Sequence, residues 1–503
     1  MPLVRRLLAV LGGILAIVVT LVVARTALLE STQRSVSVFP RVPLEANALA
    51  SRLGAALRFP TISHLEESRR DPEAFRALHA FLKTQFPGVD AALSRETIGE
   101  LSLLYRWPGS DPAKPAALLA AHQDVVPVEP GTETDWEHPP FSGAVADGAI
   151  WGRGALDDKV NLLAQLEAVE SLLAEGFEPA YTLYLAFGHD EEVGGNAGAA
   201  AIAATLAERG ERLAFVLDEG GALTAGLLPG IEAPIAVVGV AEKGYVSFDL
   251  VASGTGGHSS MPPREQAVVL LAKAVTRIDA QRPEARLTPA TRAMLETLAP
   301  EAGFGVRAVL GNLWLFEPLV LRFAAFEPSA DALVRTTTAP TMLRAGIKDN
   351  VVPGAATATV NIRLLPGDTA ADLERHLVRV IDDPRVEVVR RLRFREASRE
   401  SALEGPAFEI LSDTIRGVFP ETIVTPYLVA GGTDARHYRD LSDAVYRFAP
   451  LSLDREDRRR LHGTNERVGV KDYVEAVHFY RALIQNLDAL PGKPLNGKPE
   501  TGT

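Results

Sequence analysis

The stretch AAHQD at residues 120–124 ends a short apolar run and is followed along the chain by four further polar motifs. These motifs are GRGALDDK at 152–159, HDEEVGG at 189–195, LDEGG at 217–221 and LHGTNE at 461–466. Together they supply two histidines and several carboxylates in an order that can hold two divalent metal ions. The set predicts a hydrolytic centre.

Strands and helices alternate around these motifs. The apolar runs at 116–121, 181–187 and 213–217 are typical of buried strands, and residues 160–173 and 197–208 have the periodicity of helices. This alternation predicts an α/β fold with a mixed, mainly parallel sheet covered by helices on both faces. Because HQD, HDEE and LDEGG end predicted strands, where open α/β sheets gather their ligands, we expect the motifs to converge.

Length and pattern predict several folded units, since 503 residues are many for a single core. We expect a catalytic domain formed by residues 42–240 and 398–490. A smaller α+β domain, residues 241–397, interrupts it with its own strands and helices. Within that domain, residues 281–340 are mostly helical and rich in proline, and the sequence assigns them no role. The tail, residues 491–503, is predicted to be disordered.

Composition limits the partners and the metal ligands. The chain has 52 Lys and Arg against 64 Asp and Glu, a net charge of −12, and no dense basic patch with interleaved aromatic residues. Nucleic acid is therefore not an expected partner. Because cysteine is absent, any metal must be held by imidazole and carboxylate groups.

The N-terminus predicts a membrane segment. Arg5 and Arg6 precede an uncharged run at 7–24, close to the roughly 20 residues that cross a bilayer. We expect residues 1–28 to be an uncleaved anchor, with the rest of the chain in the periplasm or outside the cell. The alternative is a cleaved signal peptide and a secreted product, although apolar signal cores usually end at about 7 to 15 residues.

Two motifs near the first predicted strands supply the first candidate ligands. Side chains two apart in a strand share a face, so we predict that His122 binds metal and Asp124 accepts the proton of its other ring nitrogen. Without the other motifs, a histidine and an aspartate at this spacing would more often lie at the surface or in a core. Asp157 precedes a predicted helix, so it is either the helix N-cap or a carboxylate that bridges two metals, with Asp158 free to cap.

Two adjacent acidic pairs and one distant histidine complete the candidate site. Glu191 and Glu192 would repel each other unless cations or a proton compensate, and we predict that Glu192 binds metal while Glu191 is the general base. Adjacent residues that leave a strand diverge, so only one residue of LDEGG should face the metals, and we choose Asp218 over Glu219. His462 is the last predicted ligand, with a hydrogen-bonded loop histidine as the alternative. Such ligands suit zinc, with cobalt or manganese as substitutes.

Taken in order, the motifs closely resemble the M20 metallopeptidase family over nearly the whole chain beyond the anchor. AAHQDVVPV, GRGALDDK, FGHDEEVGG and LDEGG are most similar to its branch of carboxypeptidase S and the N-fatty-acyl amino acid hydrolases. The resemblance implies a dinuclear zinc domain interrupted by a lid that often dimerises, so a homodimer is one expectation. It implies His122, Asp157 and Asp218 at one zinc, Asp157, Glu192 and His462 at the other, and Glu191 as proton acceptor.

The resemblance also implies roles for three other residues. GTGGHSSMPP places His258 where the family stabilises the oxyanion, and KDNVVPG places Asn350 at a substrate-contacting asparagine. GGTDARHY places Arg436 where a guanidinium would bind a substrate carboxylate. Each residue also has a structural alternative: His258 could cap the following helix, Asn350 could form a turn, and Arg436 could pair with Asp434.

We therefore expect a membrane-anchored zinc hydrolase that cleaves an amide next to a C-terminal carboxylate, in a peptide or an N-acyl amino acid. One alternative is a deacylase or dipeptidase with no carboxylate requirement, and another is condensation of a fatty acid with an amino acid at the same site. A third is a binding module without catalysis. The presence of Glu191 beside every ligand type argues against this last alternative.

Overall fold

The computed structural model describes residues 2–226, 228 and 230–492, which form two compact units. The inserted unit consists of Ala241–Glu400, Tyr427–Gly432 and residues 2–32, and the main unit consists of Gln33–Val240, Ser401–Pro426 and residues 433–492. Residues 2–32 thus group with the inserted segment rather than standing alone. The tail expected at 491–503 lies outside the described residues from residue 493 onward.

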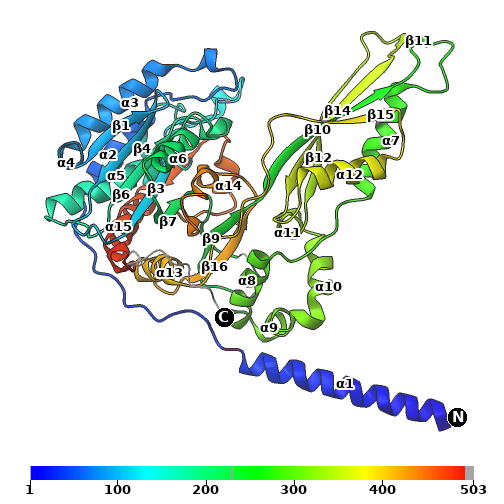
Figure 1. The fold of residues 1–503 in the computed structure, drawn as a ribbon, viewed down its shortest axis with the longest axis horizontal. Coiled ribbons are helices and arrows are strands. Elements are labelled where there is room, and N and C mark those ends of the chain that lie inside the picture. The colour runs from blue at the N-terminus through cyan, green and yellow to red at the C-terminus, as the bar shows by residue number, and fades with distance from the viewer. Residues whose placement is uncertain (1, 227, 229, 493–503) are drawn as a thin grey trace. The chain divides into compact units, whose positions relative to one another are not determined.

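A nine-stranded mixed sheet runs through the main unit, in the order β1-β2-β6-β3-β7-β17-β9-β16, with β8 paired to β9 (Figure 1). The strands β6, β3, β7 and β17 are parallel neighbours, whereas β1, β2, β8 and β9 pair in antiparallel fashion. The predicted mixed α/β class is therefore confirmed. The strand bounds are β1 Ser94–Ile98, β2 Ser102–Trp107, β3 Ala116–His122, β6 Leu183–Gly188, β7 Leu213–Asp218, β8 Ala222–Thr224, β9 Ile235–Glu242, β16 Ile423–Val429 and β17 Val445–Arg447.

Helices cover both faces of the parallel strands, as the complete burial of β3 and β6 requires. On one face α5 (Lys159–Ala174) contacts β3 and packs against α2 (Ala46–Leu57) and α15 (Val470–Asn486). On the other, α6 (Ala199–Glu208) contacts β2 and β6. Its buried residues Ala199, Ile202, Ala203 and Leu206 have the spacing of a single helix face. The remaining α-helices longer than four residues in the described part of this unit are α3 Pro72–Gln85, α4 Pro87–Ala92 and α13 Pro406–Val418.

A small antiparallel sheet joins two loops of the main unit. Its order is β18-β5-β4, with β4 at Ala144–Ala146, β5 at Ala149–Trp151 and β18 at Arg467–Gly469. Val468 of β18 pairs with Ile150 of β5. The pairing brings the segment after LHGTNE beside the segment before GRGALDDK.

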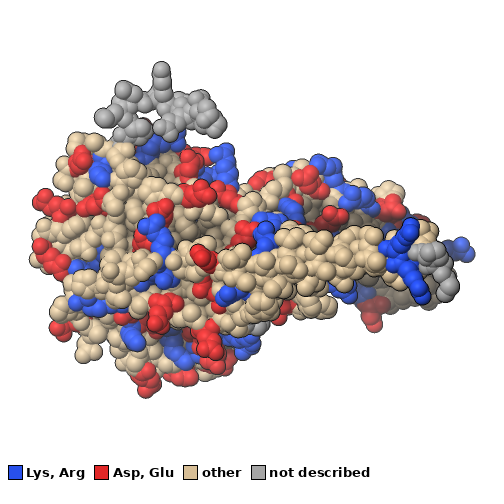
Figure 2. Space-filling model, turned by 90° about the horizontal axis from the view of Figure 1, so that it is seen from below, with Lys and Arg blue, Asp and Glu red and all other residues tan. Residues whose placement is uncertain are grey.

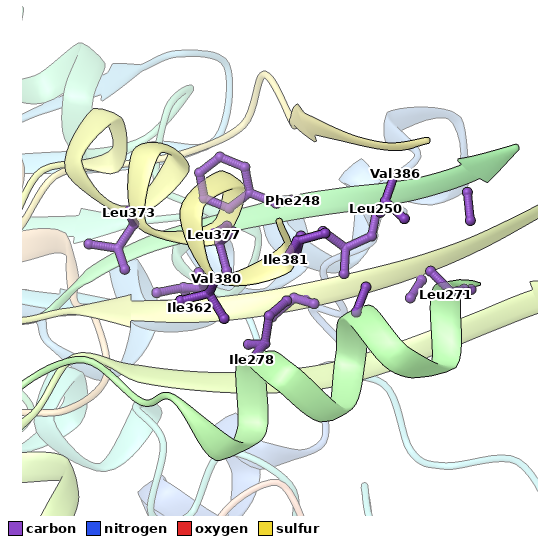
Figure 3. Close-up of a cluster of buried hydrophobic side chains, with 14 of the residues drawn as sticks. Phe248, Leu250, Leu271, Ile278, Ile362, Leu373, Leu377, Val380, Ile381 and Val386 are labelled. Atoms are coloured by element: carbon purple, nitrogen blue, oxygen red, sulfur yellow. The ribbon is translucent and has the colours of Figure 1, made fainter. Parts of the chain in front are cut away.

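The inserted unit contains a four-stranded antiparallel sheet in the order β12-β14-β10-β15. Figure 3 shows Phe248, Leu250 and Ile362 of this sheet beside Leu271 and Leu377 from two helices. These helices are α7 (Ala267–Ala280) and α12 (Ala370–Ile381), which bury one face of the sheet. The strands are β10 Gly244–Ser253, β12 Thr337–Ala345, β14 Ala355–Leu364 and β15 Val386–Arg390, and a separate pair joins β11 Gly257–His258 to β13 Val351–Val352.

Four helices and the N-terminal helix complete the inserted unit. The segment between α7 and β12 forms α8 Pro289–Leu298, α9 Phe304–Leu310, α10 Leu313–Ala324 and α11 Pro328–Val334. The N-terminal helix α1 spans Pro2–Leu28. Its segment Leu3–Leu28 is long and apolar enough to cross a membrane, and none of its most apolar window is buried. In the space-filling view of Figure 2, α1 is a rod with an uncharged surface along most of its length.

Candidate metal centre

Five histidine and carboxylate side chains converge in the main unit. His122, Asp157 and Glu219 form one group, and Asp157, Glu192 and His462 form a second group. In each group the potential ligand atoms all lie within 4.8 Å of one another. Asp157 belongs to both groups, so the two candidate sites share one carboxylate.

The parallel strands explain why three of these residues meet. His122 is the last residue of β3, Glu192 lies in the short η3 helix (Glu191–Val193) after β6, and Glu219 follows β7. Because β3 pairs in parallel with both β6 and β7, the three chain ends lie at one edge of the sheet. Asp157 precedes α5, and His462 follows α14 (Asp457–Arg460), so both come from loops.

The two oxygens of Asp157 face different histidines. Oδ1 lies 2.9 Å from Nε2 of His122, and Oδ2 lies 3.0 Å from Nε2 of His462. Nε2 of His122 is also 3.6 Å from Oε1 of Glu219, and Nε2 of His462 is 3.4 Å from Oε2 of Glu192. Imidazole nitrogen and carboxylate oxygen are donors that zinc accepts, so the residues of each group have the chemistry to hold a divalent cation.

Within LDEGG we predicted Asp218 as the ligand, and the structure groups the neighbouring residue with His122. The choice between the two carboxylates stays a prediction. Glu219, not Asp218, lies in the group with His122 and Asp157. Asp218 is the last residue of β7 and pairs in register with Arg447 of β17, so the sheet determines the direction of its side chain. Glu219 lies one residue beyond the strand and has a longer side chain, which reaches His122.

Burial and nearby negative charges raise the pKa values of two carboxyl groups at the centre. Burial, and then the charge of Asp157, raises the pKa of Glu219 to about 8. Burial also raises the pKa of Glu191 well above its ordinary value, and the carboxylate of Asp434 adds to the shift. Each of these groups is easier to protonate than a solvated carboxyl group. The centre thus has an excess of negative charge that protons or cations must balance.

The same negative charges raise the pKa values of the two histidines, which favours their charged forms. Hydrogen bonds to Asp157, and then to Glu192, raise the pKa of His462 to about 10. Burial acts to lower the pKa of His122, but the surrounding carboxylates outweigh burial and hold this pKa well above its ordinary value. Divalent cations would replace the protons that these rings carry and satisfy the same carboxylates.

The model of peptidase family M20/M25/M40 matches residues 118–486. This chain belongs to the M20 peptidase family. It is 43% identical over 446 residues to the probable carboxypeptidase S-like 2 of Dictyostelium discoideum, covering 88% of this chain and 85% of that one. It is 39% identical to the N-fatty-acyl-amino acid synthase/hydrolase PM20D1 of Homo sapiens, covering 88% of each chain. Carboxypeptidase S of Saccharomyces cerevisiae is 31% identical, over 91% of this chain and 87% of that one.

Solved structures share the M20 fold of this chain. The M20 family metallo-carboxypeptidase Sso-CP2 from Sulfolobus solfataricus has a TM-score of 0.64 at 19% identity, covering 89% of this chain and all of that one. Human carnosine dipeptidase 1 has a TM-score of 0.61 at 16% identity, covering 88% of this chain and 97% of that one. The chain is an M20-type metallopeptidase, and its candidate ligands lie in the unit that contains the mixed sheet.

Asp124 supports the M20 centre through both its backbone and its side chain. Nδ1 of His122 lies 2.9 Å from the backbone oxygen of Asp124 and 3.5 Å from its carboxylate. The carboxylate also accepts the backbone N–H groups of Glu191 and Glu192, at 3.2 and 3.1 Å, and the hydroxyl of Ser63 at 2.5 Å. Asp124 therefore contacts the His122 ring through its backbone oxygen and its carboxylate, and its carboxylate also holds the η3 turn. Its role as proton acceptor stays a prediction.

Glu466 is a positioning residue that the sequence did not identify. Its Oε1 accepts three backbone N–H groups of the loop before α5, including that of Asp157 at 3.3 Å. Its Oε2 accepts Nη1 of Arg153 at 2.6 Å, and Nη2 of Arg153 donates to the backbone oxygen of His462 at 3.2 Å. Both side chains are buried. Glu466 is the last residue of LHGTNE, the motif in which the sequence predicts His462 as a ligand.

Arg436 lies beside Glu191. Its Nη1 is 3.8 Å from Oε1 of Glu191, Nη2 donates to the backbone oxygen of Gly194 at 2.7 Å, and Nη1 also donates to the backbone oxygen of Thr433. Neither oxygen of the buried Asp434 carboxylate has a hydrogen-bond partner in the described part of the chain, but the charge of Arg436 acts to lower the pKa of this carboxyl group.

His258 and Asn350 lie together in the inserted unit. His258 pairs with Val351 across β11 and β13, and Ser259 donates its N–H to the backbone oxygen of Asn350 at 3.1 Å. The alternative role of His258 as a helix cap is wrong, because the residue before α7 is Gln266. The side-chain oxygen of Asn350 is buried, and no described residue donates a hydrogen bond to it. The substrate roles of His258 and Asn350 stay predictions.

Proposed function

We propose that this M20 enzyme cleaves the amide bond next to a free carboxylate, in an N-acyl amino acid or at the C-terminus of a peptide. We further propose two zinc ions per chain, for which cobalt or manganese could substitute. The observation that carries the proposal is the position of Asp157 between two histidine and carboxylate groups. The substrate class follows from the names of the relatives, carboxypeptidase S and N-fatty-acyl-amino acid synthase/hydrolase.

Glu191 is the residue that we assign to proton transfer. Cations bound by the two groups would polarise the amide carbonyl and acidify the attacking water. Glu191 interacts electrostatically with His122, Glu219 and Glu192 but belongs to neither ligand group, so its carboxylate is free to accept a proton. It takes the proton of the attacking water and delivers it to the leaving amine. Asp124 keeps this carboxylate in place through the N–H of Glu191.

The recognition of the carboxylate is assigned to Arg436. Two backbone oxygens hold its guanidinium, which supplies a fixed positive charge next to Glu191. A planar guanidinium suits a carboxylate partner. By resemblance, Asn350 would contact the substrate and His258 would stabilise the oxyanion.

The N-terminal helix α1 is proposed to be an uncleaved anchor. Its length and its exposed apolar surface support this assignment, with the remaining chain in the periplasm or outside the cell. A cleaved signal sequence has the same features, and N-terminal sequencing of the membrane-bound and soluble fractions separates the two. Pairing of two copies stays a prediction, which the molar mass of the purified protein tests.

The central experiment replaces Glu191 with glutamine. General acid–base catalysis contributes about 10² to 10⁴ in rate, so we expect a loss of turnover of that order. Zinc content, measured by elemental analysis, should not change, because Glu191 is not in either ligand group. Glu208→Gln, on the exposed end of α6, is the matched control and should keep full activity. Normal turnover in Glu191→Gln would remove the mechanism.

The substrate assignment is tested with pairs of compounds. Each N-acyl amino acid is assayed beside its carboxamide, with acyl chains from short to long, and simple dipeptides are included. We expect amidation of the carboxyl group to abolish cleavage in the wild type. Equal rates on acid and amide would instead establish a deacylase without a carboxylate requirement.

The condensation direction is tested with the same enzyme. A relative is named synthase/hydrolase, and a catalyst accelerates both directions of one reaction. Incubation with a fatty acid and an excess of amino acid should therefore yield N-acyl amino acid, and Glu191→Gln should lose both directions together. Retention of one direction in this variant would show that the two directions do not share the proton acceptor.

A further inference from the structure

The helical stretch at 281–340 carries an exposed apolar surface. Between Leu313 and Phe326 the exposed residues other than Ala325 recur three or four positions apart, which places them on one side of the helix. Phe326, Phe323 and Trp314 are 76%, 64% and 55% exposed. Arg322 is the charged residue among these exposed positions. The surface, termed the α10 face, consists of Trp314, Leu315, Pro318, Leu319, Arg322, Phe323 and Phe326.

The C-terminal end of α1 contacts the junction between α9 and α10. Thr26 is fully buried, and its hydroxyl accepts the side-chain N–H of Asn312 at 3.3 Å. Trp314 donates its indole N–H to the side-chain oxygen of Asn312 at 3.2 Å. The side chain of Leu29 lies close to the backbone of Gly311. The α10 face begins at Trp314, two residues after Asn312, and Asn312 contacts the C-terminal end of α1.

The two helices are not suited to cross a bilayer. Together α9 and α10 have the length and composition of a membrane span, but they are bent by 105° at the break between them. A short helix with one apolar face lies in the plane of the interface instead. The α10 face also has the residues that favour this position, because tryptophan gathers at the headgroup level and a long basic side chain extends toward water.

We propose that the α10 face docks on the surface of the same bilayer that α1 crosses. The lipid surface is favoured over a second copy of the chain because Asn312 and Thr26 tie this face to the end of the candidate span, where headgroups begin. The inference rests on the proposed anchor and not on the proposed substrate. It gives the enzyme two attachments to the lipid phase, in which long-chain N-acyl amino acids would partition.

Tryptophan fluorescence of the full-length protein tests the docking. The chain has four tryptophans, and Trp107, Trp136 and Trp151 are buried in the main unit at 4%, 7% and 3% exposure. Only Trp314 exposes its indole to a large extent. In phosphatidylcholine vesicles with brominated acyl chains, we expect quenching that is strongest for bromines nearest the headgroups. Trp314→Phe should remove this quenching.

Two outcomes would overturn the proposal. The first is equal emission in brominated and ordinary vesicles. The second is a blue-shifted Trp314 emission that bromine does not quench, which would assign the α10 face to a protein contact. In the double variant Leu319→Asp and Phe323→Asp, we expect quenching to fall several-fold. Val378→Asp, at an exposed apolar residue on α12, is the control and should be quenched like the wild type.

Activity measurements keep this inference separate from the proposed function. The double variant should hydrolyse a water-soluble short-chain substrate normally and raise the KM for a long-chain substrate in vesicles several-fold. If Trp314 is quenched but no acyl amino acid is cleaved, the docking stands and the substrate assignment fails. If hydrolysis is normal and Trp314 is not quenched, the docking fails and the function stands.

Discussion

Replacing Glu466 with alanine should destabilise the main unit and weaken its hold on metal. The carboxylate is fully buried and accepts three backbone N–H groups as well as the guanidinium of Arg153. The alanine variant leaves that guanidinium buried without its partner, which costs about 3 to 5 kcal/mol. Both loops that carry Asp157 and His462 lose a support, and the loss of such partners lowers metal affinity by about 10- to 100-fold.

Glu466→Gln should have a smaller effect. Burial, and then the charge of Asp157, raises the pKa of Glu466 to about 7. The amide therefore imitates the protonated carboxyl group, and its oxygen can still accept N–H groups of the loop. We expect the order of stability to be wild type, glutamine variant, alanine variant, in urea unfolding of the zinc-loaded protein. Zinc affinity, measured by competition with a chelator well below the unfolding transition, should follow the same order.

The matched control is an Arg–Glu pair that lies at the surface and is joined by two hydrogen bonds. Arg209 and Glu96 are joined at 2.8 and 2.6 Å, but their side chains are 38% and 41% exposed. Glu96→Ala should cost about 0 to 1 kcal/mol, because exposed pairs contribute little. If Glu466→Ala is as stable as Glu96→Ala and binds zinc like the wild type, the positioning role of Glu466 is refuted.

Three further predictions concern the ligands, the metal and a buried lysine. Glu219→Ala should lose zinc and activity while Asp218→Asn keeps its zinc, and the opposite result in elemental analysis would restore Asp218 as the ligand. Chelation should abolish hydrolysis and lower the thermal midpoint, since metal at about 100 times its Kd stabilises by about 2.7 kcal/mol, and zinc should restore both. Burial, and then Arg363, lowers the pKa of Lys243 to about 7, so the folded state binds this proton less tightly than the unfolded state. Stability should therefore rise with pH between about 7 and 10.5, and urea titrations of Lys243→Met should lack this rise.

The parallel centre of the main sheet was predictable, whereas the edge strand β12 of the sheet in the inserted unit was not. Strands β3 and β6 are buried throughout and appear in the sequence as continuous apolar runs. Strand β12 in the inserted unit contains Pro340 and is exposed over most of its length, so it has neither an apolar run nor an alternating pattern. An edge strand of this kind is defined by its partner, which a single sequence does not show.

The candidate ligands were predictable as residue types, because zinc chemistry limits the donors and strand ends limit their positions. The choice between Asp218 and Glu219 depended on where β7 ends, a boundary that differs by one residue between the two alternatives. The partners of Asp124 and Glu466 are separated from them by tens to hundreds of residues, and no local pattern reports such contacts.

Different structural features position the two halves of the metal centre. The ends of β3, β6 and β7 bring His122, Glu192 and Glu219 together, because parallel neighbours finish at one edge. No such strand ends at Asp157 or His462. Instead, β18 pairs with β5 immediately after Glu466, and Gly152 donates its N–H to the backbone oxygen of Glu466 at 3.0 Å.

The small β18-β5-β4 sheet therefore aligns the two distant loops, and the carboxylate of Glu466 then fixes the register of the Asp157 loop against the His462 loop. Asp157 can belong to both groups only if this sheet and Glu466 place it next to the ends of the parallel strands. This requirement explains why LHGTNE and GRGALDDK, about three hundred residues apart, act as one structural element. It also explains why a residue that touches no proposed cation should control the affinity for metal.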